Sequence, residues 1–331
     1  MMFFSIIIPV FNRPDEVEEL LESLVIQTEK NFEIIIVEDG SSEKCDTIIK
    51  KYSDKLKITY EYKKNEKPAI ARNYGAKHAN GDYFVFFDSD CIIPPEYFKT
   101  VNHVLKNNYT DAYGGPDAAS PNFNNLQKAI NYAMTSFFTT GGIRGGDEKL
   151  EKFYPRSFNM GISKKAFKTI GGFPETKMHP GEDMVFSIEI IKHGFTTQRI
   201  KNAFVYHKRR NTLKTFFKQV YNFGKTRSII TEKYPETFKL FFFAPSAFTI
   251  GTLFFIISTF ICIYSLIPVL FYILLIFLDS LLKNKNIAVS LLSIITSFYQ
   301  LIAYGSGFLI SFWKVKILKK DEFNVLKKGF Y

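Results

Sequence analysis

The residues best suited to chemistry follow an apolar run. The stretch FVFFDSDCIIPPEY, residues 84–97, places Asp88 and Asp90 directly after large apolar side chains typical of a buried strand. A buried carboxylate without a partner is costly. In an extended segment the two carboxylates point to the same side, because side chains repeat every two residues. The pattern favours a divalent cation; a solvated turn, or a helix N-cap before residues 94–105, is the alternative.

An alternation of strands and helices must position these carboxylates. The apolar runs 3–11, 32–40, 57–64 and 83–90 predict strands, and residues 14–27, 45–54 and 68–79 predict the helices between them. Such an order predicts an α/β fold, with a mostly parallel sheet and helices on both faces. Ligands bind such sheets at the carboxyl ends of the strands, where Asn12, Asp39 and Asp88 all fall.

The distribution of charge disfavours a nucleic-acid partner. The chain has 331 residues and a net charge of +11, but residues 199–239 hold eleven Lys or Arg against two Glu, a local balance of 11 − 2 = +9. Residues 240–278 then carry no charged side chain at all. Positive charge beside a long apolar run is typical of membrane proteins. The three cysteines, Cys45, Cys91 and Cys262, fit neither a disulfide framework nor a four-cysteine zinc site.

The apolar C-terminal half predicts membrane segments. A run of 39 uncharged residues is too long for one span of a core about 30 Å thick, so we expect a helical hairpin at 240–280 and a further segment at 287–313. The basic residues before 240 place the preceding N-terminal domain on the cytoplasmic face of an inner-membrane, multi-pass protein. The third segment either spans, which leaves the basic tail 314–331 outside, or breaks at Gly305-Ser306-Gly307 into a re-entrant segment.

The basic region 209–239 interleaves aromatic side chains with cations. Phe216, Phe217 and Tyr221 stand among Lys214 and Lys218. This spacing predicts an amphipathic helix in the membrane interface, with aromatic side chains toward lipid and cations toward anionic headgroups. The alternative is a solvated helix packed on the preceding domain.

Several short motifs together carry a family resemblance. They are SIIIPVFN at 5–12, VEDGSS at 37–42, ARNYGAKHANGDYFVFFDSD at 71–90, GGF at 171–173 and GED at 181–183. In this order and spacing they resemble the family 2 glycosyltransferases of the GT-A fold, over about residues 3–225. The resemblance implies a GT-A catalytic domain at 1–208. YGSGF at 304–308 further resembles membrane-bound bacterial polysaccharide enzymes of the succinoglycan type.

The resemblance implies a nucleotide-sugar donor and a divalent metal. It implies that Pro9 and Asn12 line the nucleotide slot, that Asp39 binds the base, and that Arg72 contacts the base or the diphosphate. For Pro9, a plain strand terminator is the alternative.

Three residues are implied as metal ligands. Mn²⁺ or Mg²⁺ would be held by Asp90, with Asp88 and His207 as further ligands, and would stabilise charge on the leaving diphosphate. Contact with the ribose is the alternative for Asp88. His207 falls where some relatives place a third metal ligand or a phosphate contact, and a lone histidine often has neither role.

The GED motif implies the catalytic base. Asp183 matches the family's catalytic aspartate, which takes a proton from the acceptor hydroxyl during a single inverting displacement. It precedes a predicted helix whose dipole favours the carboxylate. Glu182 would bind the acceptor. Ordinary N-terminal capping of that helix is the alternative for both residues.

We therefore expect an inverting glycosyltransferase in surface polysaccharide biosynthesis. Its acceptor would be a polyprenyl-diphosphate-linked glycan in the membrane. Processive synthases of the family carry Gln-x-x-Arg-Trp, and residues 219–223 read QVYNF without the Arg-Trp pair. This favours addition of a single sugar over the alternative of a processive polysaccharide synthase. A silent membrane scaffold is the other alternative, disfavoured by the intact Asp88, Asp90 and Asp183.

Overall fold

The computed structural model describes residues 2–141, 153–175 and 180–320. These form two compact units: the first takes 2–120, 153–175 and 182–208, and the second takes 121–141, 180–181 and 209–320. The strands and helices of the first unit are β1 (Phe4–Val10), α1 (Pro14–Val25), β2 (Phe32–Asp39), α2 (Asp46–Tyr52), β3 (Ile58–Lys63), α3 (Pro68–Lys77), β4 (Tyr83–Phe87), β5 (Cys91–Ile92), α4 (Tyr97–Asn107), β6 (Ala112–Gly114), β7 (Asp117–Ala118), β8 (Asn159–Ser163), α7 (Lys164–Ile170), α8 (Glu182–Lys192), β9 (Thr197–Arg199) and β10 (Val205–His207).

The first unit is built on a seven-stranded sheet in the order β3-β2-β1-β4-β8-β6-β9. The first four of these strands are parallel, and β8 runs antiparallel to both β4 and β6. The expected mostly parallel α/β sheet is confirmed. Pro9 lies in β1, paired with Val37 on the β2 side, while the ladder with β4 ends at Ile7. A residue without an N–H therefore stands where β1 has no partner on its other side.

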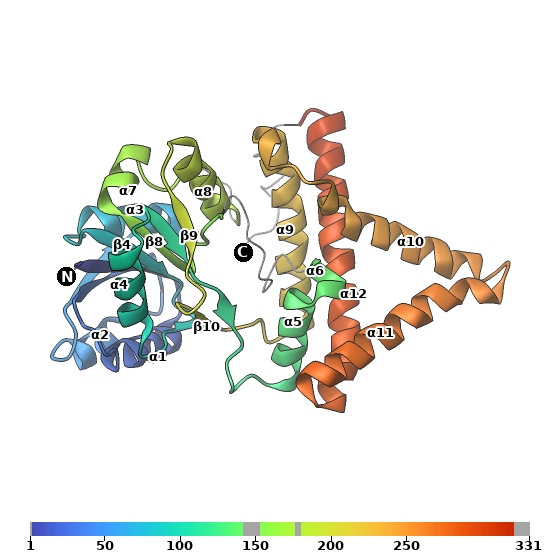
Figure 1. Ribbon diagram of the computed structural model, residues 1–331, viewed down its shortest axis with the longest axis horizontal. Helices are drawn as coiled ribbons and strands as arrows, with labels where there is room; N and C mark the ends of the chain where they lie inside the picture. The colour runs from blue at the N-terminus through green and yellow to red at the C-terminus, as the bar shows by residue number, and fades with distance from the viewer. Residues whose placement is uncertain (1, 142–152, 176–179, 321–331) are drawn as a thin grey trace. The chain divides into compact units, whose positions relative to one another are not determined.

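Helices cover both faces of the seven-stranded sheet (Figure 1). Ile6 and Ile8 of β1 pack in one cluster with side chains of α1, α2 and α4. Ile7, between them, packs in the other cluster with side chains of α3, α7 and α8. This is the period of two expected of a strand covered on both sides. The arrangement leaves the carboxyl ends of β1, β2 and β4 at one edge.

A second sheet of three short strands, β5-β10-β7, continues from that edge. β5 and β10 are antiparallel, and Cys91 pairs with His207. β5 begins directly after Asp90, so this ladder fixes His207 beside the segment that carries both aspartates. The position of His207 therefore follows from backbone pairing rather than from its own side chain.

The second unit is helical and contains the three apolar segments. Its helices are α5 (Asn125–Thr135), α6 (Phe137–Thr140), α9 (Leu213–Lys233), α10 (Ala244–Ser258), α11 (Ile267–Asn284) and α12 (Ile287–Phe312), with short 3-10 helices at Pro235–Thr237, Leu240–Phe243 and Ile263–Leu266 and a π-helix at Trp313–Ile317. Three stretches, Leu240–Ser258, Ile263–Asn284 and Ile287–Ile317, are long and apolar enough to cross a membrane. The predicted C-terminal membrane helices are thus present, and α12 continues unbroken through Gly305-Ser306-Gly307.

Two stretches of the predicted domain 1–208, residues 121–141 and 180–181, group with the helices of the second unit. The longer stretch contains α5. The reason is the apolar face of α5, where Ile130, Ala133 and Met134 pack with Phe216 of α9 and Ala303 of α12. A segment between two strands of the first unit is therefore used to complete the second.

Helix α9 packs against α12 and α5 through the side that was expected to face lipid. Phe216 and Val220 are fully buried in the cluster with α5 and α12. Lipid contact is therefore wrong for Phe216, because protein covers it. Gly224 lets the backbones approach: a Cβ there would lie 2.1 Å from the carbonyl oxygen of Tyr304. The position of α9 at the membrane surface stays a prediction.

We predict that Gly224→Ala destabilises the second unit by about 1–3 kcal/mol, because the added methyl group overlaps the α12 backbone. The matched control is Gly251→Ala on α10, whose Cβ would meet nothing within 4 Å and which should be neutral or stabilising. Thermal unfolding of the full chain in detergent, followed by the fluorescence of its single tryptophan, Trp313, checks this. Equal melting temperatures of the two variants would contradict the close packing.

Candidate active site

Asn12 joins the end of β1 to the loop after β2. Its backbone has φ of 51°, in the left-handed region that asparagine tolerates. Its side-chain oxygen accepts hydrogen bonds from the N–H groups of Ser42, at 2.8 Å, and Glu43, at 3.1 Å. Its own N–H donates to Ser41 Oγ at 2.8 Å. Asn12 thereby fixes the shape of the slot that the sequence assigned to the nucleotide.

Glu38 and Asp39 are the last two residues of β2, and their side chains stabilise two different segments. Glu38 is fully buried and accepts hydrogen bonds from Ser41 Oγ, the Cys45 N–H and the Tyr60 hydroxyl, the last at 2.8 Å. Burial and this hydrogen bond raise the pKa of Tyr60. The longer side chain of a glutamate, where aspartate is the usual family residue, is thus used to hold the loop after β2.

The Asp39 carboxylate faces the segment before α3. It accepts from Lys63 Nζ at 2.9 Å and from the N–H groups of Glu66 and Lys67 at 3.0 and 2.9 Å. Only 3% of Asp39 is exposed. Asp39 therefore stabilises the turn into α3, and its predicted contact with the base stays a prediction.

Arg72 is the buried centre of the site. Its guanidinium donates to Asp88 Oδ1 at 2.7 Å and to Glu182 Oε1 at 3.3 Å, and lies over the Phe173 ring. Burial alone would lower the pKa of Arg72, but the carboxylates of Asp88 and Glu182 raise it above its ordinary value. Arg72 thus ties the carboxyl end of β4 to the first residue of α8. It joins two motifs that are 94 residues apart, counted from Asp88 to Glu182.

Asp90 lies between the side chains of Arg13 and His207. Arg13 donates to its Oδ2 at 2.8 Å, and the Nε2 of His207 lies 3.1 Å from its Oδ1. The His207 ring stacks on Phe158. The structure therefore brings Asp90 and His207 together, as the sequence predicted.

Three possible metal-ligand atoms gather here, from Asp90, Cys91 and His207, within 4.8 Å of one another. Burial, with the nearby Asp90 carboxylate, raises the pKa of the Cys91 thiol well above its ordinary value. A protonated thiol is a poor ligand. Carboxylate oxygens and one imidazole nitrogen are a donor set that suits Mn²⁺ or Mg²⁺ better than a softer metal. Asp90 and His207 therefore fit the expected cation, whereas Asp88, whose Oδ1 accepts from Arg72, is not one of the gathered residues.

Asp183 lies in the first turn of α8, next to Glu182. Arg156, just before β8, donates to its Oδ1 at 3.2 Å, and the same oxygen accepts the Met184 N–H at 2.7 Å. The side chain is 20% exposed, so a substrate hydroxyl can reach it. Its orientation is fixed from two directions. Such an arrangement suits a general base that must meet a hydroxyl in one geometry.

Sequence reasoning missed three cations that hold the acidic residues. They are Arg13 on Asp90, Lys63 on Asp39 and Arg156 on Asp183. Arg13 had a signal, because it follows Asn12 at the end of a predicted strand. Lys63 stands at the end of another strand. Nothing in the sequence around Arg156 distinguishes it from a surface arginine.

Comparison with known proteins decides the family. Residues 5–171 match the family model described as glycosyl transferase family 2. The chain belongs to this family. It is 30% identical over 245 residues to an uncharacterised glycosyltransferase of Haemophilus influenzae, covering 70% of this chain and 77% of that one. The expected enzyme class, a glycosyltransferase, is confirmed.

Two further relatives extend the comparison. A transferase of Methanococcus voltae, named dolichyl N-acetyl-alpha-D-glucosaminyl phosphate 3-beta-D-2,3-diacetamido-2,3-dideoxy-beta-D-glucuronosyltransferase, is 27% identical over 322 residues, 92% of this chain and 96% of its own. With an uncharacterised Rickettsia felis glycosyltransferase the match is 49% over 86 residues, which span only 14% of that protein.

Among solved structures, the mannosyltransferase PcManGT of Pyrobaculum calidifontis, in complex with GDP-Man and Mn²⁺, is similar with a TM-score of 0.56. The identity is 16%, over 72% of this chain and 65% of that one. This likeness concerns the fold, and it confirms the GT-A fold for this family 2 glycosyltransferase. The narrower resemblance to succinoglycan-type enzymes stays a prediction.

We predict that Arg72→Met lowers the stability of the full chain by about 3 kcal/mol, because it removes the guanidinium from the buried Glu182 carboxylate. Glu182→Gln in the same background should restore part of the loss. The control Lys99→Met breaks an exposed pair with Glu96 and should change stability little. Melting temperatures of these three variants and of Glu182→Gln alone test the coupling. Strictly additive effects of the two site substitutions would show that Arg72 and Glu182 do not depend on each other.

Proposed function

We propose that this family 2 enzyme transfers one sugar, with inversion, from a nucleotide-diphosphate sugar to a lipid-linked glycan at the cytoplasmic face of the inner membrane. The observation that carries the proposal is the bridge through Arg72, which sets Asp88 at the end of β4 against Glu182, the neighbour of Asp183. Residues for donor binding and a candidate base are thereby fixed on adjoining elements. Such proximity is what a single displacement requires.

The donor side is formed by the ends of β1, β2 and β4. We propose that Pro9 and Asn12 line the nucleotide slot and that Asp39 binds the base. Asp39 holds the backbone that leads into α3 and Arg72. A base bound beside it would therefore contact a segment whose conformation is already fixed. Arg72 is almost fully buried, and we infer that it acts on the donor through Asp88 rather than by direct contact.

Asp90 and His207 offer oxygen and nitrogen donors for a divalent metal. PcManGT, which shares the fold, is in complex with Mn²⁺ and GDP-Man. When bound, such a cation neutralises charge on the leaving diphosphate. Asp90 would hold it, with Asp88 and His207 as further ligands. Arg13, which donates to the second oxygen of Asp90, orients this carboxylate and adds positive charge beside the diphosphate.

The acceptor side begins at α8. We propose that Asp183 takes the proton from the acceptor hydroxyl as the new glycosidic bond forms, and that Glu182 positions the acceptor. Arg156 holds the Asp183 carboxylate from one side, which leaves the other oxygen for the hydroxyl. The bond between the sugar and the diphosphate breaks in the same step, and the nucleoside diphosphate leaves with the electron pair.

The lipid-linked acceptor is inferred from the second unit and from one relative. Three long apolar helices follow a catalytic unit that would need no membrane to act on a soluble acceptor. The Methanococcus voltae relative, which matches 92% of this chain, is named for a dolichyl-linked sugar substrate. We propose a polyprenyl-diphosphate-linked glycan for this enzyme. The missing Arg-Trp pair at 219–223 supports the addition of a single sugar.

We predict that Asp90→Asn abolishes metal-dependent sugar transfer while the protein stays folded and membrane-bound, because the metal loses a charged ligand. Transfer from a panel of UDP-, GDP- and dTDP-sugars, measured against Mn²⁺ concentration, gives the test and identifies the donor. The control Asp54→Asn removes an exposed carboxylate outside the site and should leave transfer unchanged. Full activity of the unaltered enzyme in EDTA would remove the metal from the proposal.

We predict that Asp183→Asn lowers kcat by about 10²–10⁴-fold with unchanged donor affinity, because the amide keeps the contacts of the side chain but cannot accept the proton. Glu189→Gln, further along the same helix, serves as the matched control and should behave as the unaltered enzyme. Donor binding by calorimetry and single-turnover transfer separate the two effects. Weaker donor binding with normal turnover of bound donor would place the base elsewhere.

A further inference from the structure

Helix α12, the third apolar segment, is packed along its length on a charged helix. Phe217 of α9 contacts the Tyr299 ring, Gly224 meets the backbone of Tyr304, and Glu232 pairs with Lys316 at 3.0 Å. The contacts advance together along both helices, so α9 and α12 run parallel. Between its ends α9 carries the charged residues Lys214, Lys218, Lys225, Arg227, Glu232 and Lys233.

The packing against α9 restricts where α12 can lie relative to a membrane. If α12 crossed a membrane, α9 would cross with it and would carry its charges into hydrocarbon. Charged side chains at the centre of a bilayer are strongly unfavourable. At the surface the same residues are favourable, because cations meet anionic headgroups there. The pairing with α9 therefore places α12 parallel to the membrane surface.

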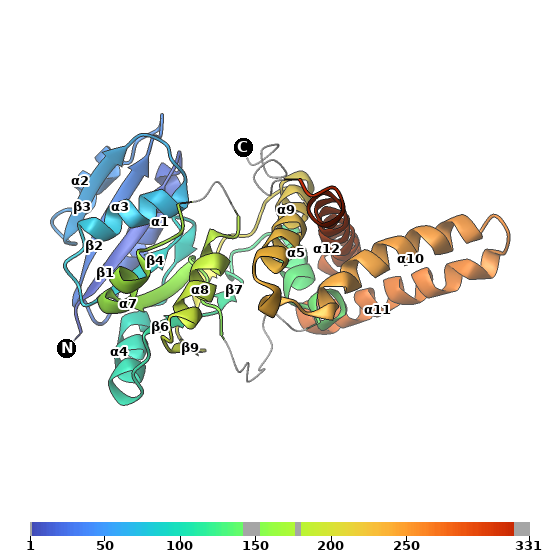
Figure 2. The ribbon, with the colours of Figure 1, turned by 90° about the horizontal axis from the view of Figure 1, so that it is seen from above.

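Helices α10 and α11 leave α12 at a steep angle and form a hairpin (Figures 1 and 2). Their bases rest on α12: Ser246 Oγ donates to the Gly305 carbonyl at 3.1 Å, and Ser280 Oγ to Ser293 Oγ at 2.8 Å. Beyond the bases, none of residues 247–275 is buried. The hairpin is therefore the part of the second unit that protein does not cover.

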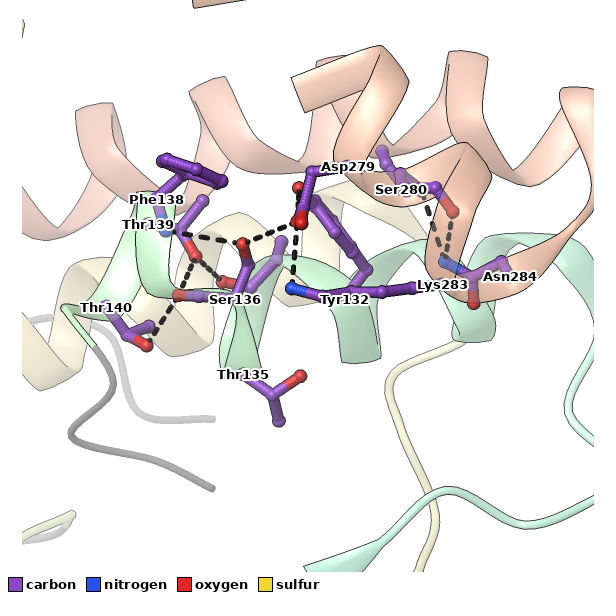
Figure 3. A network of polar contacts seen from close by, with 12 residues as sticks. Tyr132, Thr135, Ser136, Phe138, Thr139, Thr140, Asp279, Ser280, Lys283 and Asn284 are labelled. Carbon is purple, nitrogen blue, oxygen red and sulfur yellow. Dashed lines mark hydrogen bonds and ion pairs between the residues drawn. The ribbon is translucent and has the colours of Figure 1, made fainter. Parts of the chain in front are cut away.

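Charged and polar contacts mark the base of this hairpin (Figure 3). Asp279 accepts hydrogen bonds from Tyr132 at 2.6 Å, from Ser136 at 3.4 Å and from Lys283 at 2.9 Å. These partners lie in α5, in the cap of α6 and in α11 itself. Residues 240–278, which include the whole tip, carry no charge. The boundary between water and hydrocarbon thus falls near Asp279, at the level of α5 and α12.

The helices of the hairpin are each shorter than a full span beyond their bases. On α10, from Gly251, which follows the hydrogen bond of Thr249 to α12, to Ser258 there are eight residues, or roughly 12 Å of helix. On α11, from Ile267 to Asp279 there are thirteen residues, or roughly 20 Å. The hydrocarbon core is about 30 Å thick, so neither helix reaches across it.

The tip is also suited to lie inside lipid. Phe260 and Ile261 are 90% and 91% exposed, and the N–H groups of Ile261 and Cys262 both donate to the Ser258 carbonyl. A turn that satisfies its backbone groups internally can remain in hydrocarbon.

We propose that this enzyme is monotopic: the α10–α11 hairpin enters the cytoplasmic leaflet and returns, while α9 and α12 lie in the membrane surface. The basic residues after Trp313 then lie on the cytoplasmic face, which removes the conflict with the positive-inside rule that a third span would create. The expected multi-pass topology is replaced by a re-entrant one. The inference rests on the membrane location in the proposed function and is independent of donor and acceptor.

Cysteine labelling in oriented vesicles tests the proposal with the full chain. Cys262 at the tip is exposed, whereas Cys45 and Cys91 are buried, so the natural protein already carries a probe. Asn211→Cys and Lys319→Cys, each with Cys262→Ser, report the two sides of the helical unit. With a membrane-impermeant maleimide, both new cysteines should react only in inside-out vesicles. Cys262 should react in neither orientation until detergent is added.

Each other pattern overturns the proposal. Reaction of Lys319→Cys only in right-side-out vesicles means that the chain crosses the membrane between the two new cysteines. Reaction of Cys262 in right-side-out vesicles means that the hairpin crosses. Its reaction in inside-out vesicles without detergent means that the hairpin lies outside the hydrocarbon. Transfer activity is measured in the same vesicles, so failure of the topology and failure of the proposed function are recorded separately.

Discussion

The contact on which the catalytic unit depends is the buried guanidinium of Arg72. A charge almost wholly removed from water is stable only where opposite charges and hydrogen bonds compensate it. Asp88 and Glu182 supply both, and Phe173 covers the guanidinium plane. Because α3 supplies the arginine, β4 one carboxylate and α8 the other, three elements must be in place together. The geometry of the site at the carboxyl ends of the strands therefore depends on the assembled sheet and not on any single loop.

The strands and helices up to β4 could be predicted from the sequence because each packs against elements that are close to it in the chain. Ile6, Ile7 and Ile8 alternate between two apolar layers, and a period of two is visible in the letters. The edge that carries Asn12, Asp39 and Asp88 follows from the same pattern. The pairing of Asp90 with His207 was expected from the family motifs, and the β5–β10 ladder supplies its physical cause.

The arginines that pair with the acidic site residues could not be predicted from the sequence pattern. Arg156 and Asp183 are 27 residues apart and Arg13 and Asp90 are 77 apart, and each pair meets only through the fold. The burial of Phe216 was missed for a similar reason. An aromatic and basic helix has the same pattern whether lipid or another helix covers its apolar side, and only the position of α5 and α12 separates the two cases.

The hydrogen bond from Thr296 to the carbonyl of Ala129 joins residues 167 apart in the chain, and it has a consequence for synthesis. Strands β1 to β4 need only the first hundred or so residues to pair, whereas α5 waits for α12, almost the last helix to be made. At about 5–20 residues per second the part of the α5 surface that α12 covers stays exposed for roughly 8–33 s. During that interval it is a site for chaperones or for the membrane surface itself. Delivery of the nascent chain to the membrane before α12 is complete would shield it, so the order of the segments favours assembly during translation.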